Sequence, residues 1–187
     1  MSEQYDEIPE RMRAFIEVQH VFFVATAPAS GEGRVNLSPK GLRDTFRVLD
    51  AHTVAYLDFV GSGVETISHL RENGRIVVMF CAFQGPPNIV RLHGRGEAVE
   101  PGDPRFPALV KRFPDGPGIR AVVLVRVERA SDSCGYGVPL FEYQGERTAL
   151  GTWAEKRGRE GLVEYQRRKN AQSIDGLPGL RWVSGEE

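Results

Sequence analysis

Glycine and proline recur along the whole length of this chain and restrict the folds open to it. Together, 21 glycines and 12 prolines account for 33 of the 187 residues, about 18% where about 12% is usual. Because they are dispersed, they indicate many turns between short strands and not one flexible linker. We therefore do not expect an all-helical fold. One domain of this length can bury enough core to need neither disulfides nor metals.

Between these turns, runs of apolar and β-branched residues predict short strands. The strands are expected at residues 21–26, 34–38, 53–58, 75–81, 89–99 and 119–127. The first two flank a short turn that contains glycine, which predicts a hairpin. Many short, mostly antiparallel strands at this spacing are typical of a closed β-barrel or a sandwich.

Helical patterns occur at both ends of the chain and between the strands. Helices are expected over 6–18, from Gly61-Ser62-Gly63 to Asn73-Gly74, around 103–113 and over 147–170. The first has apolar residues on one face. In the last, basic residues are interleaved with acidic ones, which indicates a solvated helix face.

The charge balance argues against a nucleic-acid partner, because 24 Lys and Arg against 25 Asp and Glu leave a net charge of −1. No apolar run reaches the ~20 residues that a membrane span needs, and the acidic N-terminus lacks the apolar segment of a signal peptide. Cys81 and Cys134 form no CxxC pattern and are interpreted as reduced thiols. We expect a cytoplasmic protein without nucleic-acid or membrane partners.

Familiar catalytic patterns do not occur in this sequence. The four histidines have none of the close spacings of metal sites, so no metal is expected. A nucleophile elbow, a Walker loop and a complete dinucleotide fingerprint are also missing. No catalytic acid or base is therefore assigned.

Three features suit an anionic ligand. Gly61-Ser62-Gly63 leads into a helix whose N-terminal N–H groups suit a phosphate, although Ser62 can also be a simple N-cap. The stretch 36–40 ends a strand with Pro39 and Lys40, which is also the pattern of a solvated strand end. Neither feature alone identifies a ligand.

The third feature is a row of cations on the strand 89–99. Arg91, His93 and Arg95 share one face, opposite Gly94 and Gly96. Such a row normally faces water, but the small glycines indicate that something packs close to the strand. Together the three features suit one phosphorylated, planar ligand.

As a set, several segments resemble the pyridoxamine 5′-phosphate oxidase-related proteins. They are Val35-Asn36-Leu37-Ser38-Pro39-Lys40-Gly41, Phe46–Asp50, Thr53–Asp58 with Gly61-Ser62, Arg71–Arg75, Ile76–Phe80 and Val90–Ala98. The resemblance implies a mainly β fold, an antiparallel split β-barrel of FMN-binding type with an N-terminal helix and a helical C-terminal segment. Residues 1–130 would form the FMN-binding domain, and 131–187 a loop-helix extension of it.

The resemblance also implies FMN at a homodimer interface. In this family, the residues that correspond to 36–40 lie along the isoalloxazine ring, and the loop that corresponds to 61–63 lies near the ribityl phosphate. The strand that corresponds to the one ending at Asp58 lines the site. Trp153 is expected to reach the flavin of the partner subunit. The cofactor-binding residues expected are Asn36, Leu37, Ser38, Lys40, Asp58, Gly61, Ser62, Gly63, Arg91 and Trp153.

The chain departs from the true oxidase at the phosphate loop. Gly63 and Val64 stand where that enzyme has Arg and Lys, and Val35, beside Arg34, stands where it has an arginine. The arginine-rich substrate motif near the C-terminus is also missing. We therefore do not expect oxidation of pyridoxamine phosphate. Tail segments such as 133–139 and 173–179 resemble those of a bacterial subgroup of the family.

These features lead to a hypothesis with alternatives. The first hypothesis is that the protein is an FMN-dependent oxidoreductase acting on a small molecule, with Lys40 stabilising negative charge on the reduced flavin. The alternatives are a non-catalytic module that binds FMN or another planar cofactor, a deazaflavin-dependent reductase, and a dimeric scaffold that has lost its cofactor.

Overall fold

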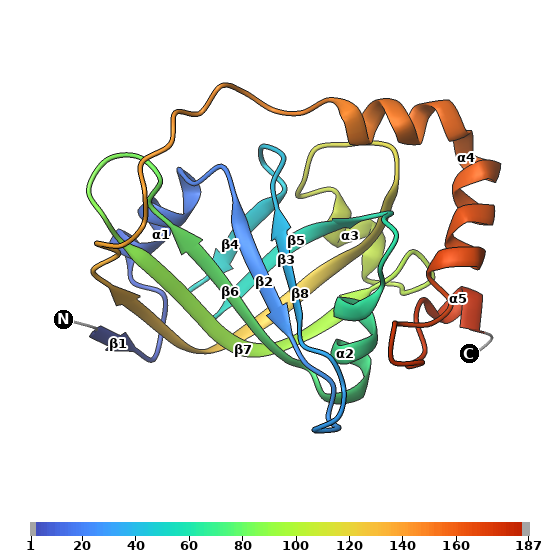
Figure 1. The fold of residues 1–187 in the computed structure, drawn as a ribbon, viewed down its shortest axis with the longest axis horizontal. Helices are drawn as coiled ribbons and strands as arrows, with labels where there is room; N and C mark the ends of the chain where they lie inside the picture. The colour runs from blue at the N-terminus through green and yellow to red at the C-terminus, as the bar shows by residue number, and fades with distance from the viewer. Residues whose placement is uncertain (1–2, 185–187) are drawn as a thin grey trace.

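The fold is a curled antiparallel sheet with helices at its ends and on its flank (Figure 1). A computed structural model describes residues 3–184. Residues 1–2 of the predicted FMN-binding domain and residues 185–187 of its predicted extension lie outside the described residues. The strands are β1 (Glu3–Tyr5), β2 (Phe22–Thr26), β3 (Asn36–Lys40), β4 (Phe46–Asp50), β5 (Thr53–Phe59), β6 (Arg75–Cys81), β7 (Ile89–Val99) and β8 (Ile119–Ser133). Their order across the sheet is β3-β2-β6-β7-β8-β5-β4, with β1 paired to β8.

Five helices accompany the sheet. They are α1 (Glu10–Glu17), α2 (Glu65–Asn73), α3 (Phe106–Val110), α4 (Ala149–Lys169) and α5 (Arg181–Ser184). Helix α2 packs against β2 and β7, α1 against β4 and α3 against β8. A long connector after β8 crosses the molecule to reach α4 (Figure 1). No helix within residues 3–184 combines the length and apolar character that a bilayer span requires.

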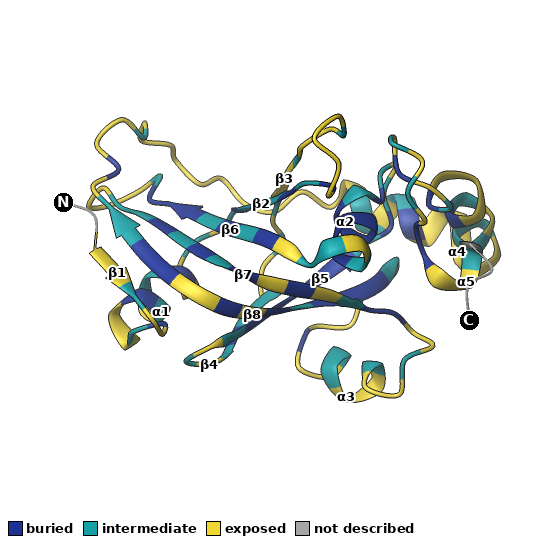
Figure 2. Cartoon of the chain, turned by 90° about the horizontal axis from the view of Figure 1, so that it is seen from below, coloured by how far each residue is buried: buried dark blue, intermediate teal, exposed yellow. Residues whose placement is uncertain are grey.

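The predicted split barrel is confirmed, and the sheet is not closed. Strands β3 and β4 are its two ends, so the barrel is open between them. The concave side holds the main core, to which β2, β6, β7 and β8 contribute alternate residues. Figure 2 shows this alternation of buried and more exposed positions along the strands. The barrel is therefore open, and the expectation of a closed barrel or a sandwich is wrong.

Most predicted elements occur close to their expected bounds. The strands 75–81 and 89–99 have the bounds expected, and Gly74 ends α2 in the left-handed conformation with φ 70°. Strands β1 and β4 and helix α5 were not among the elements that periodicity predicted. Strand β8 runs on to Ser133, across the proposed boundary after residue 130, which stays a prediction.

The glycines of β7 allow the close packing that the sequence indicates. A Cβ on Gly94 would overlap the carbonyl oxygen of Arg126 in β8, and one on Gly96 would press against Leu70 of α2. The pairing of β7 with β8 shifts register between His93 and Gly94. These glycines therefore bring neighbouring elements of this chain together, and they are no evidence for a ligand.

Candidate functional site

Asn36, Ser38 and Lys40 project from the core-facing side of β3. Ser38 pairs with Val24, and Lys40 pairs with Phe22. Val24 and Phe22 are core residues of β2, and paired residues project to the same face of a sheet. Because β3 is an end strand, its polar row lies at the opening of the barrel.

Lys40 connects this row to a buried ion pair. Its Nζ lies 2.9 Å from Oδ1 of Asp58, and Nε of Arg120 lies 2.6 Å from Oδ2 of the same carboxylate. The side chain of Asp58 is 0% exposed and that of Arg120 is 5% exposed, whereas Lys40 is 23% exposed. Lys40 is therefore the member of this group through which the site meets solvent.

The two cations determine the charge state of Asp58. Burial alone would raise its pKa, but Arg120 and Lys40 outweigh that effect and lower the pKa to about 2. Asp58 is thus ionised at neutral pH, and the three groups together carry one net positive charge. A nearby Tyr56 hydroxyl is buried without a hydrogen-bond partner among residues 3–184, and burial raises its pKa well above the ordinary value.

A second set of hydrogen bonds connects β3 to α2. Asn36 Nδ2 donates to Thr66 Oγ1 at 3.0 Å and to Thr26 Oγ1 at 3.2 Å, and Ser38 donates to Asn36 Oδ1 at 3.0 Å. Thr26 Oγ1 also lies 3.0 Å from Nδ1 of His69. These bonds hold β3 against α2 and fix the orientation of the polar row.

His69 leaves one polar atom unsatisfied in this cluster. The residue is 0% exposed, and its Nε2 has no hydrogen-bond partner in the described part of the chain. Burial lowers the pKa of His69, so the ring is neutral at pH 7. Such an atom is costly to leave unpaired.

The loop 61–63 lies beside the ion pair. Arg120 donates to the Gly63 carbonyl at 2.8 Å, and Asn170 donates to the Gly61 carbonyl at 3.0 Å. The N-cap of α2 is Val64, and no side chain in the described region caps it. The interpretation of Ser62 as a simple N-cap of this helix is therefore wrong.

Leu37 and Arg91 lie on the opposite face of the sheet from Asn36 and Lys40. Leu37 pairs with Ala25 of β2, and Arg91 pairs with Met79 of β6. Arg91 donates from Nη1 to Ser133 Oγ at 3.1 Å. Within one chain, the structure does not bring these two predicted site residues to the polar row.

Trp153 lies on α4 and packs within that helix. Its ring contacts Tyr165 edge-on, with 5.0 Å between centroids, and the Arg157 guanidinium lies 4.8 Å from its centroid. Helix α4 bends at Gly158, where φ is 62° and ψ is 177°. The expected contact of Trp153 with a partner's flavin stays a prediction.

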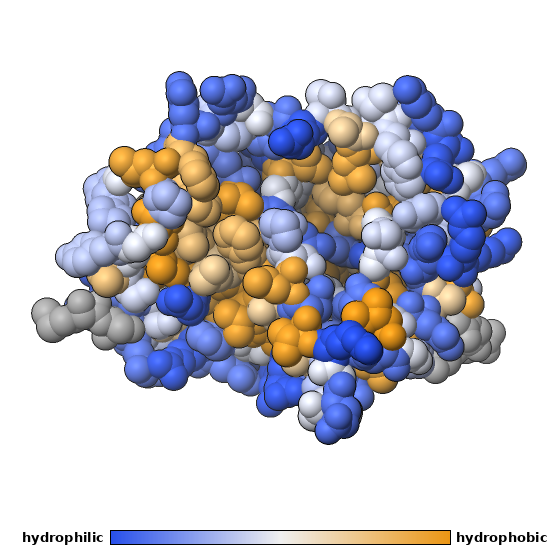
Figure 3. Space-filling model, in the orientation of Figure 1, coloured by the Kyte–Doolittle hydropathy of each residue, from blue (hydrophilic) through white to orange (hydrophobic). Residues whose placement is uncertain are grey.

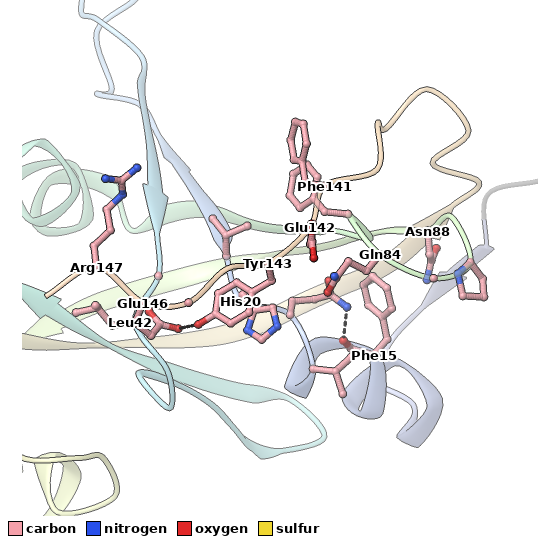
Figure 4. Close-up of a pocket in the computed structure, with 18 residues that line it drawn as sticks. Phe15, His20, Leu42, Gln84, Asn88, Phe141, Glu142, Tyr143, Glu146 and Arg147 are labelled. Atoms are coloured by element: carbon pink, nitrogen blue, oxygen red, sulfur yellow. Dashed lines mark hydrogen bonds between the residues drawn. The ribbon is translucent and has the colours of Figure 1, made fainter.

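An aromatic pocket begins one residue after Lys40 (Figure 4). Its volume is about 970 Å³, and Gly41 and Leu42 form part of its wall. The connector forms the opposite wall: Tyr143 stacks on His20 with 3.6 Å between centroids. The lining also includes Phe15, Val18, Gln19, Val21, Phe83, Gln84, Gly85, Pro86, Asn88, Phe141, Glu142, Gly145, Glu146 and Arg147.

The comparison with known proteins agrees with this geometry. The family profile described as Pyridoxamine 5′-phosphate oxidase matches residues 8–134. The chain belongs to the pyridoxamine 5′-phosphate oxidase family. The pyridoxamine 5′-phosphate oxidase family protein ustO of Aspergillus flavus is 43% identical over 192 residues, which covers 94% of this chain and 77% of that protein. The match with ustO extends beyond the part that the profile covers.

Solved structures share the fold. HupZ of Group A Streptococcus superposes with a TM-score of 0.52 at 25% identity and covers 67% of this chain and 99% of its own. A Clostridium acetobutylicum protein related to general stress protein 26 gives a TM-score of 0.51 at 12% identity, covering 66% and 86%. The split barrel of the pyridoxamine 5′-phosphate oxidase family is therefore the architecture of this chain.

The residues of the site fit the ring of the flavin that the family implies. The polar row of β3 and the cation of Lys40 suit the polar edge of an isoalloxazine ring. At the loop 61–63, where Gly63 and Val64 stand in place of the true oxidase's cations, the Glu65 carboxylate lies against Gly63 and the Arg120 guanidinium donates to the Gly63 carbonyl.

Sequence reasoning missed three members of the site: Arg120, His69 and Asn170. Arg120 interrupts a strongly apolar strand, which is the one signal that a buried partner was needed. His69 was interpreted as a structural residue, and its buried hydrogen bond to Thr26 agrees with that. Asn170 follows a run of basic residues and shows no local signal.

Proposed function

We propose that this member of the pyridoxamine 5′-phosphate oxidase family is a flavin-binding oxidoreductase, with FMN as the flavin. The observation that carries the proposal is the half-buried Lys40 above the fully buried pair of Asp58 and Arg120. A bound flavin supplies the capacity to transfer electrons or hydride. Lys40 presents a fixed positive charge to it, which favours negative charge that develops nearby.

The proposed ligand contacts follow the positions of the residues. Asn36 and Ser38 line the ring on the same face as Lys40, Asp58 and Arg120 hold Lys40 in place, and the loop 61–63 lies at the far end. Ordering of Asn36 by two threonine hydroxyls supports this, because a pre-arranged polar row loses little entropy on binding.

We propose that two chains form a homodimer through the outer face of the sheet. On that face Ala25 pairs with Leu37 and with Val77, so the three side chains form one apolar row across β3, β2 and β6. Figure 3 shows apolar side chains gathered on the face that carries β2 and β6. In the dimer, Arg91 and Trp153 would approach the flavin of the other subunit.

The aromatic pocket is the proposed entrance for a small-molecule substrate. It adjoins Lys40 through Gly41, and its size is in the usual range of ligand sites, about 300–1,000 Å³. Its stacked aromatic pairs suit a planar, largely uncharged molecule. For location, the free thiols of Cys81 and Cys134 support the reducing cytoplasm.

Absorbance of the purified protein tests the proposal. After FMN has been added and unbound flavin removed by dialysis, we expect the protein to retain a flavin absorption band that is shifted from that of free FMN. Anaerobic mixing with NADH, NADPH or a reduced deazaflavin should then bleach the band, which separates an oxidoreductase from a non-catalytic binding module. A protein that stays colourless contradicts the proposal.

A further inference from the structure

The loop 41–45 crosses the opening of the barrel directly after Lys40. It joins β3 to β4, which are the two end strands of the sheet. Gly41 and Leu42 of this loop line the aromatic pocket (Figure 4). The same two residues also line a second cavity, which has a volume of about 630 Å³. Leu42 therefore lies where the two cavities adjoin.

Leu42 has a backbone conformation that leucine rarely adopts. Its φ is 72°, and Asp44, two residues later, has a φ of 65°. This left-handed conformation is unfavourable for a bulky side chain, whereas aspartate tolerates it. Within residues 3–184, the other residues with positive φ are all glycines: Gly74, Gly85, Gly118, Gly135, Gly145, Gly158 and Gly176. A glycine at position 42 would avoid the cost, so the leucine side chain there calls for an explanation.

Hydrogen bonds of Thr45 hold the loop in this conformation. Thr45 is buried, and its Oγ1 donates to the carbonyl oxygens of Gly41 at 2.9 Å and of Leu42 at 2.8 Å. The N–H of Leu57 in β5 donates to the Thr45 carbonyl at 2.9 Å. The loop is therefore anchored to the sheet, and the position of Leu42 is fixed before a ligand binds.

The hydrophobic core does not account for Leu42. The residue is half-buried, yet it belongs to none of the core clusters formed by residues 3–184. Two other residues line both cavities and are held by contacts within the chain: Gln19 Nε2 donates to the Phe15 carbonyl at 2.9 Å, and His20 stacks on Tyr143. The Leu42 side chain makes neither kind of contact with the described residues, so its apolar surface is available to a ligand in the pocket.

We propose that Leu42 is a substrate-binding residue of the aromatic pocket, held in a left-handed conformation at a cost in stability because its side chain contacts the apolar ring of the substrate. Strained backbone of this kind occurs at ligand sites whose surroundings hold it in place. The loop 41–45 supplies one wall of the pocket and the connector, with Tyr143, supplies the other. A flat, uncharged ring between them contacts both walls. The inference rests on the proposed substrate pocket.

Thermal unfolding of the full chain and fluorescence titration with 2-naphthol test the inference. In Leu42→Gly the strain is relieved, so we expect a midpoint of unfolding about 2 °C higher than in the wild type. The lost side chain should raise the Kd for 2-naphthol at least about threefold. Leu42→Ala keeps a Cβ in the strained conformation, so we expect the same loss of binding without the higher midpoint. Asp44→Gly is the matched control, because Asp44 lines the second cavity and not the aromatic pocket, and it should bind 2-naphthol like the wild type.

The two measurements together separate a ligand contact from a structural one. A Leu42→Gly variant that is no more stable than the wild type overturns the inference, because the side chain then supports the fold. An unchanged Kd in either Leu42 variant overturns it as well, and weaker binding by Tyr143→Ala in the same titration would leave the pocket itself in place. A wild type that does not bind 2-naphthol contradicts the proposed pocket and the inference with it.

Discussion

Asp58 and Arg120 lie 2.6 Å apart in the barrel, and neither is appreciably exposed to solvent. Asp58 belongs to β5 and Arg120 to β8, next to a register shift between these strands. A buried pair of this kind adds little net stability over an apolar pair, but breaking it is costly. The pair also positions Lys40, because the second carboxylate oxygen of Asp58 lies 2.9 Å from the Lys40 Nζ.

Replacement of Asp58 should show how much the fold depends on the pair. Asp58→Asn leaves Arg120 buried without its counter-charge, so we expect the free energy of unfolding to fall by about 3–5 kcal/mol. Urea denaturation followed by circular dichroism measures this. The exposed Asp115→Asn should change it by less than about 0.5 kcal/mol, and an equally small change in Asp58→Asn would contradict the account.

The same carboxylate predicts a loss of stability in acid. Burial opposes the ionised form, yet Arg120 and Lys40 lower the pKa of Asp58 from 3.8 to about 2. Because the folded pKa lies below the unfolded one, the contribution is full above about pH 5 and is lost as pH falls toward 2. Its size is about 2 kcal/mol.

Unfolding free energies between pH 6 and pH 2 test this. The wild type should lose stability more steeply below about pH 4 than Asp58→Asn, which has no carboxyl to protonate. Equal slopes for the two proteins would show that other carboxyls, such as that of Asp103, account for the loss.

Local sequence signals were sufficient for most of the strands. The runs 75–81 and 89–99 have strong β-branched or alternating patterns, and the structure has strands with those bounds. Strand β1 and helix α5 span only Glu3–Tyr5 and Arg181–Ser184, too short for a period to be visible. Their formation depends on contacts with distant segments, which no local pattern reports.

The candidate site was predictable only in part, for a related reason. The polar row of β3 was visible as a motif, and Lys40 does meet a second site residue, Asp58. Arg120 and Asn170 come from positions 62 and 109 residues away from their partners, Asp58 and Gly61. Alternation along the strands places Leu37 and Arg91 on the outer face, so the predicted site residues are divided between the two sides of the sheet.

The proposed homodimer predicts that a charge on the outer face of β3 yields monomers. Leu37 is 65% exposed in the single chain, and a buried carboxylate without a partner disfavours an interface. We expect Leu37→Glu to be monomeric by light scattering where the wild type is dimeric. Ile174 is 64% exposed on the C-terminal segment, and Ile174→Glu should remain dimeric. A dimeric Leu37→Glu would place the interface elsewhere.

The aromatic pocket predicts binding of a neutral aromatic molecule. Tyr143 stacks on His20 at its wall, and loss of such a partner should weaken binding of 2-naphthol roughly three- to tenfold in Tyr143→Ala. Titration monitored by naphthol fluorescence measures this. Tyr136 lies on the same connector, 83% exposed and outside the pocket, so Tyr136→Ala should bind like the wild type. Equal Kd values for the two variants would contradict the role of the pocket.

The reduction potential of the bound flavin tests the central claim, that Lys40 presents its charge to the flavin ring. Lys40→Met removes that charge and leaves Asp58 less compensated, so both effects make the potential more negative. A loss of about 1.4 kcal/mol corresponds to about 30 mV for a two-electron couple. We predict a decrease of at least this size in Lys40→Met, with Lys40→Arg and the exposed Lys111→Met close to the wild type. A potential and a flavin affinity that both stay unchanged in Lys40→Met would contradict the account.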